Sequence, residues 1–244
     1  AAAAASCTRE FQAPDGEEAT LTVTASLDAA MDGGTKASAD GGLTNLAAQG
    51  GYSLRYNMEL WSHDGETMEY KATPRYIDIA DNMSMSVEYN LSLLAKKYKM
   101  VLWADIVKKN DDGTVTAYYT VYETAGLTAI RFPEWSAFGS DEYDAFTAVA
   151  EVDLTGGSKV IRATLKRPFA KIRVIDDRTE SFPGTEYTTK LTFDSSVSIP
   201  VEYNALTGKV TSATNDITET PTCTSTFEDG TGLCLFTGYI FVPE

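Results

Sequence analysis

The sequence Thr20-Leu-Thr-Val-Thr-Ala-Ser-Leu27 alternates strictly between polar and apolar residues. In an extended chain, alternate side chains point to opposite faces, so this stretch predicts a β-strand with one buried face. The predicted buried face consists of Leu21, Val23, Ala25 and Leu27.

The same alternation recurs along the chain and predicts an all-β protein. Residues 52–61 and 83–93 alternate in this way, so each predicts a strand with one face in water. Residues 98–107 are apolar at most positions, which predicts a strand covered on both faces. An Asn-Asp-Asp-Gly turn at 110–113 then predicts a hairpin to residues 115–122. Further strands are expected at 146–154, 160–165, 169–175, 188–193, 196–203 and 233–242.

Helical periodicity is scarce. Residues 140–146 are expected to form one helical turn, and the Ala-, Gly- and Asp-rich residues 28–51 are expected to form a loop. Many short strands with turns between them are typical of sandwiches and barrels.

The chain has 244 residues, of which 20 are Lys or Arg and 35 are Asp or Glu, for a net charge of −15. Such an acidic surface repels phosphate backbones and anionic lipids, so we expect no nucleic-acid partner and no direct membrane-surface binding. No apolar run is long enough to span a bilayer. An apolar content of 43% is sufficient for a packed core, and the length allows two domains.

Candidate catalytic and metal-ligating residues are few. The one histidine, His63, lies in Trp61-Ser-His-Asp-Gly65, which predicts a surface hairpin turn. The sequence has no Gly-x-Ser-x-Gly motif, and acidic pairs arise by chance among 35 carboxylates. We therefore expect no enzymatic activity, no cofactor and no metal. The aromatic residues are expected either to fill the core or to form a sugar-stacking platform.

The three cysteines suggest different roles. Cys7 follows Ala1–Ala5 and Ser6, as in the tail of a lipoprotein signal peptide, so residues 1–18 are expected to be a leader and tether with lipid on Cys7. The alternative is an unrelated poly-Ala leader. Cys223 and Cys234 flank residues 227–230, which predicts either a disulfide across a hairpin or two buried thiols.

Two segments, taken in order, resemble the fimbrillin family of Bacteroidia pilins. The first is residues 19–27, a Gly- and Ala-rich loop with the single basic residue Lys36, and the strand Leu54-Arg-Tyr-Asn-Met-Glu-Leu60. The second is Leu165-Lys-Arg-Pro-Phe-Ala-Lys-Ile-Arg-Val174. The residues of this second segment that match the family motif are Arg167, Pro168, Ala170 and Lys171.

The resemblance implies two transthyretin-like, Greek-key β-sandwich domains in tandem, over residues 19–160 and 161–244. Family members continue beyond the point that corresponds to Glu244, so the second domain is expected to be incomplete here.

The resemblance also implies a function: a structural pilus subunit that serves adhesion at the cell surface. In such pilins an outer-membrane lipoprotein precursor is cut by a trypsin-like protease, here after Lys36. The strand at 20–27 then leaves, and a strand from another pilin subunit replaces it. The implied partners are other pilin subunits and the protease, and the outer membrane is contacted only through lipid on Cys7. The alternatives are an anchor or tip subunit, or a surface lipoprotein that binds glycan or host protein without polymerising.

Overall fold

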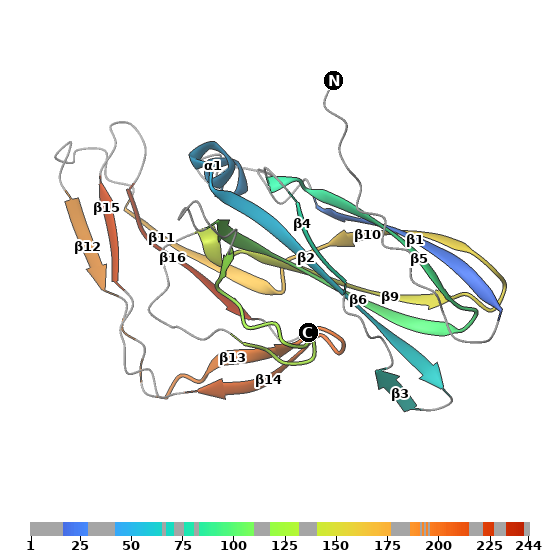
Figure 1. The fold of residues 1–244 in the computed structure, drawn as a ribbon. Helices are drawn as coiled ribbons and strands as arrows, with labels where there is room; N and C mark the ends of the chain where they lie inside the picture. The colour runs from blue at the N-terminus through green and yellow to red at the C-terminus, as the bar shows by residue number, and fades with distance from the viewer. Residues whose placement is uncertain are drawn as a thin grey trace, which may run out of the picture.

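A computed structural model describes residues 17–28, 42–64, 67–70, 76–80, 83–109, 118–131, 141–176, 186–190, 192, 194, 196–214, 222–226 and 233–241. These residues form strands almost throughout, with one short helix, so the all-β prediction is confirmed (Figure 1).

The largest sheet has six strands and is built around two long ones. Strand β2 pairs antiparallel with β6, and each of the two carries shorter strands along its other edge. The strands are β3 (Thr67–Tyr70) and β4 (Tyr76–Ala80) on β2 (Tyr52–Asp64), and β7 (Tyr118–Thr120) and β9 (Ala145–Asp153) on β6 (Lys97–Lys109).

A three-stranded sheet packs against one face of this large sheet. Its order is β10 (Lys159–Leu165), β1 (Glu18–Leu27) and β5 (Ser86–Leu94). The first core lies between the two sheets and contains the alternate apolar residues of β1, β2 and β6. The alternation at 20–27 therefore predicted both the strand and its buried face correctly.

The C-terminal strands form three smaller sheets. The pairs are β11 (Phe169–Asp176) with β16 (Leu233–Phe241), β12 (Glu186–Lys190) with β15 (Thr222–Thr226), and β13 (Ile199–Asn204) with both β14 (Lys209–Thr214) and β8 (Ile130–Arg131).

A second core lies on the other face of β6. Trp103 meets Tyr122 edge-on with ring centroids 5.4 Å apart, and Tyr203 stacks on Phe241 at 5.2 Å. Residues 100–107 are all buried because one side chain in two enters each core. The prediction that this strand is covered on both faces is confirmed.

The polar face of β2 was expected to lie in water, and that expectation is wrong. Ser53, Asn57 and Glu59 are buried on the side of the second core. The Oε1 atom of Glu59 accepts a hydrogen bond from the backbone N–H of Leu127 at 3.0 Å, so residues beyond β7 cover this face. A buried polar group needs such a partner to offset its loss of water.

Two local predictions are corrected. Residues expected to form only a loop contain helix α1 (Gly42–Gln49), which is anchored by buried Leu43 and Leu46. His63 lies in β2 opposite Met68 of β3, so it belongs to a strand and not to a turn. The single helical turn expected near residue 140 is present as the 3₁₀ helix η4 (Asp141–Tyr143).

The boundary predicted at residue 160 falls inside β10. That strand pairs with β1 from residue 159 to residue 165, so it belongs to the three-stranded sheet. The second core also joins the large sheet to the C-terminal strands, and the tandem-domain arrangement stays a prediction.

Candidate functional site

The strand that the resemblance marks for displacement is β1, and it lies in the middle of the three-stranded sheet. Leu21, Val23 and Ala25 are completely buried, and Leu27 is nearly so. All four predicted core positions of this strand thus face the first core.

Both edges of β1 are hydrogen-bonded, in opposite senses. It runs parallel to β10, with Leu21 opposite Lys159 and Leu27 opposite Leu165. It runs antiparallel to β5, with Glu18 opposite Leu94. Without β1, the strands β10 and β5 would each present an unpaired edge beside a row of apolar pockets, which is a ready template for another extended chain.

The outer face of β1 makes only exposed polar contacts. The Thr22 hydroxyl donates to Asn90 at 2.8 Å, and the Ser92 hydroxyl donates to the Glu18 carboxylate at 2.8 Å. Hydrogen bonds in water contribute little net free energy. The affinity of the sheet for β1 therefore comes from its apolar face and its backbone.

A second feature is the ion pair between Arg167, the first residue of the predicted family motif, and Asp144. The Nε atom of Arg167 lies 2.7 and 2.9 Å from the two carboxylate oxygens, and Nη2 lies 2.6 Å from Oδ2. The guanidinium also sits over the ring of Phe146 at 5.2 Å. This pair fixes the chain at the point where β10 leaves the three-stranded sheet and leads into β11.

Tyrosines surround this ion pair. Tyr239 donates its hydroxyl to Asp141 at 2.8 Å, and burial followed by the charges of Asp144 and Asp141 raises its pKa far above the usual value. Burial also raises the pKa of Tyr122, whose hydroxyl donates to the carbonyl oxygen of Tyr143 at 2.5 Å. Both phenols stay protonated near neutral pH and act as hydrogen-bond donors.

The other three residues of the predicted family motif differ in burial and in strand pairing. Pro168 is buried, and Ala170 is exposed on β11. Lys171 is paired in register with Tyr239.

Several predicted residues are not brought together with these features. Cys7 and Lys36 lie outside the described residues. Cys223 is opposite Thr189 in the β12–β15 ladder, whereas Cys234 is opposite Ile175 in the β11–β16 ladder. The disulfide between the two cysteines stays a prediction.

Sequence reasoning missed Asp144, Tyr122 and Glu59, all of which are buried. The only local signal for Asp144 was its place at the end of the acidic stretch Asp141-Glu-Tyr-Asp144, directly before an apolar strand. Its partner lies 23 residues further along the chain.

Within the described ranges, no three or more His, Cys, Asp and Glu side chains are grouped as metal ligands would be. The helices of that same part of the chain are too short or too polar to cross a membrane.

A family model described as "Family of unknown function (DUF6562)" matches residues 13–244. The chain belongs to the DUF6562 family. The relation of this DUF6562 protein to the fimbrillins stays a prediction.

No curated protein matches this DUF6562 chain. A crystal structure described as a "putative adhesin" from Bacteroides ovatus ATCC 8483 is similar to it, with 10% sequence identity and a TM-score of 0.39. The similarity covers 91% of this chain and 66% of the other. A likeness at this level says nothing about function.

Proposed function

We propose that this protein is a non-enzymatic structural subunit of a cell-surface pilus, and that it assembles by exchanging β1 for a strand of a neighbouring subunit. The observation that supports this most is the setting of β1. Its apolar face is buried in the first core, both of its edges are paired, and Lys36, the predicted cleavage point, follows it in the sequence.

The burial of β1 sets the barrier to its loss. A fully buried Leu or Val side chain contributes about 1.5–3 kcal/mol relative to water, and β1 buries Leu21, Val23 and Leu27 in addition to Ala25. While the chain is intact, β1 is also tethered to its own groove. Spontaneous loss is therefore rare, and the precursor stays monomeric.

A cut after Lys36 would change this balance. It turns β1 into a separate peptide and removes the effective concentration that the tether supplies. A strand from a neighbour then competes on equal terms, and it wins where its side chains fill the pockets better. The partners in this proposal are other subunits of the same filament and the trypsin-like protease.

The test is assembly of the purified precursor after treatment with a protease that cuts at basic residues. Lys36→Ala should stay monomeric, whereas Lys36→Arg should assemble at least as well as the native chain. Lys209→Ala is the matched control because it removes an exposed lysine from β14, away from β1. The readout is filament length by electron microscopy together with N-terminal sequencing of the product.

Filaments of normal length from Lys36→Ala would contradict cleavage at this residue. Arg55 is a poor substitute for the protease, because it lies in β2 and its side chain is paired with Asp105 and only 13% exposed. Cleavage at Arg9 would then be the remaining alternative near β1, and sequencing would reveal it.

The surface location in this proposal rests on lipidation of Cys7. Cys7→Ala should leave the precursor unprocessed and absent from the outer surface of the cell. Surface labelling of intact cells measures this, and unchanged display would contradict the lipoprotein part of the proposal.

A further inference from the structure

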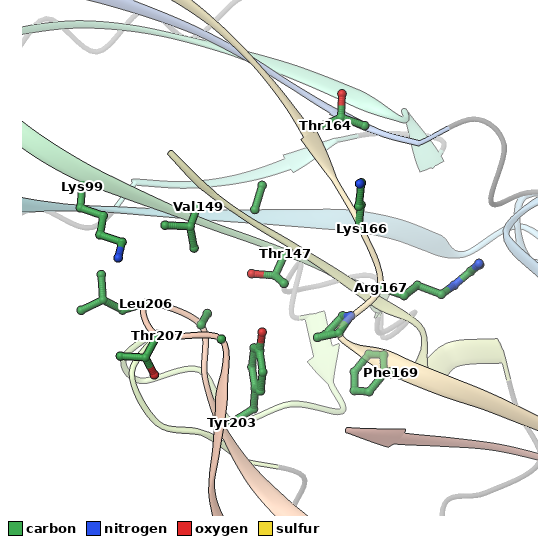
Figure 2. A pocket seen from close by; sticks show the side chains of 14 residues that line it. Lys99, Thr147, Val149, Thr164, Lys166, Arg167, Phe169, Tyr203, Leu206 and Thr207 are labelled. Atoms are coloured by element: carbon green, nitrogen blue, oxygen red, sulfur yellow. The ribbon is translucent and has the colours of Figure 1, made fainter. Parts of the chain in front are cut away.

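A cavity of about 540 Å³ opens beside the second core, where three segments meet. The large sheet contributes Lys99 and Thr147, the chain after β10 contributes Lys166, and the turn between β13 and β14 contributes Thr207 (Figure 2). Its volume is within the range of small-molecule sites in proteins. The lining includes no residue of β1.

The charge of this cavity is opposite to that of the protein. Among the described residues, Lys99, Lys166 and Arg167 line it and no acidic residue does so, although the chain has 35 acidic and 20 basic residues. Arg167 is neutralised by Asp144 and points away from the cavity in Figure 2. Of the two remaining cations, Lys99 turns its amine toward the middle of the cavity, whereas the amine of Lys166 points toward Thr164 in the same view.

Neither lysine is neutralised by a neighbour in the described part of the chain. No carboxylate there lies within salt-bridge distance of Lys99 or Lys166, in contrast to Lys97, which lies 3.8 Å from Asp153. Glu151 is opposite Lys99 in the β6–β9 ladder but does not line the cavity. The local potential thus favours an anion.

Hydroxyl groups and apolar surface complete the lining. Figure 2 shows the hydroxyls of Thr147 and Tyr203 and the amine of Lys99 turned toward the middle of the cavity. Thr147 donates its own proton to the carbonyl of Leu102 at 2.9 Å, so its oxygen is left to accept a hydrogen bond. Phe169 supplies an apolar wall.

We propose that this cavity binds an acidic saccharide, meaning a sugar of one or two rings that bears a carboxylate or sulfate group. The anionic group would bind the ammonium group of Lys99, and Lys166 would add positive charge at the edge of the cavity. The sugar hydroxyls would exchange hydrogen bonds with Thr147 and Tyr203, and the C–H face of the ring would lie on the apolar wall. A phosphorylated ligand fits less well, because phosphate sites commonly use a helix N-terminus and neither described helix lines this cavity.

The test uses the whole chain and a disaccharide that contains glucuronic acid, with its free carboxylate or as the methyl ester. Isothermal titration calorimetry at low salt should detect binding of the acid, with the ester binding at least about tenfold more weakly. Inorganic sulfate, used alone, should bind more weakly than the acid. Added salt should weaken the binding of the acid.

Variants assign the binding to the cavity. Lys99→Gln should weaken binding of the acid about tenfold, because it removes the charge-assisted contact, and Lys166→Gln should weaken it less, because its amine is not turned into the cavity. Lys97→Gln lies on the same strand outside the cavity and should leave the affinity unchanged.

Four results would overturn the proposal: no binding of the acid, equal binding of the ester, sulfate binding as tightly as the disaccharide, or equal losses in Lys97→Gln and Lys99→Gln. The comparison of acid with ester requires no variant, so the test holds even where a substitution disturbs folding.

Discussion

Replacing Arg167 by Met should lower the free energy of unfolding by about 3–5 kcal/mol, the usual cost of leaving one partner of a buried ion pair uncompensated. The Asp144 side chain is 2% exposed, and that of Arg167 is 19% exposed. Water therefore does not replace the three short contacts that the guanidinium makes. Met keeps the aliphatic part of the side chain but removes the guanidinium, so the loss reports the ion pair together with the contact on the ring of Phe146.

The assay is urea-induced unfolding followed by tryptophan fluorescence, since Trp103 lies in the adjoining core. Arg131→Met is the matched control. Arg131 pairs with Glu202 at 2.6 Å, but its side chain is 62% exposed, so its loss should matter far less.

A double variant separates charge from packing. Arg167→Met combined with Asp144→Leu should recover most of the lost stability, because no buried charge is then left alone. A loss below about 1 kcal/mol in the single variant, or a double variant less stable than the single one, would refute this account of the pair.

Three further predictions concern stability. Leu21→Ala should cost about 2–5 kcal/mol in the free energy of unfolding measured in urea, since Leu21 is completely buried, whereas Thr22→Ala on the outer face should change it by less than about 0.5 kcal/mol. Burial and a hydrogen bond to Glu142 raise the pKa of Tyr52 from 10.0 to about 12. The folded state therefore keeps the phenol protonated where the unfolded state loses the proton, and the free energy of unfolding should fall as the pH rises from 10 to 12. Thermal melts of Tyr52→Phe should lack that decline, and an identical decline would count against the assignment. Hydrogen bonds from Arg131 and then Thr211 lower the pKa of Glu202 below its usual 4.5, so this carboxylate stabilises the fold above that pH. The destabilisation that Arg131→Gln causes at neutral pH should therefore shrink as the pH falls below 4.5. A difference in melting temperature that stays constant with pH would contradict this prediction.

The long strands could be predicted from the sequence because burial imposes a period of two on them. The face of β1 that begins at Leu21 is a clear case. The sheet that β1 forms with β10 and β5 has one face against the first core, and the threonines of β1 lie on the other face. Strand β6 was equally predictable from the sequence. Its two faces enter two different cores, so consecutive residues are apolar instead of every second one.

The errors came from contacts that are distant in sequence. Asn57 and Glu59 occupy the polar positions of an alternating strand, which is typical of a face in water. Nothing near them in the sequence indicates that residues 121–131 cover them. Strand β14 was missed because Lys209–Thr214 is mostly exposed and has no apolar face. Helix α1, in which Leu43 and Leu46 are buried, has eight residues and is too short for a clear periodic signal.

The candidate sites were predictable to different degrees. The four core positions of β1 follow directly from the alternation. The charged cavity does not, because Lys99, Lys166 and Thr207 come from segments that only the fold brings together. Asp144 could be recognised only once Arg167 was placed beside it.

The position of β1 between two strands of opposite direction has a mechanical consequence. Its ladders run from Leu21 to Leu27 on β10 and from Glu18 to Ser26 on β5, side by side along nearly the same length. A pull along the axis of the strand therefore loads both ladders in shear, and many hydrogen bonds must yield together. A pull across the sheet would break them one pair at a time. A chain held by a strand in this groove would resist stretching along the strand far better than peeling from either end.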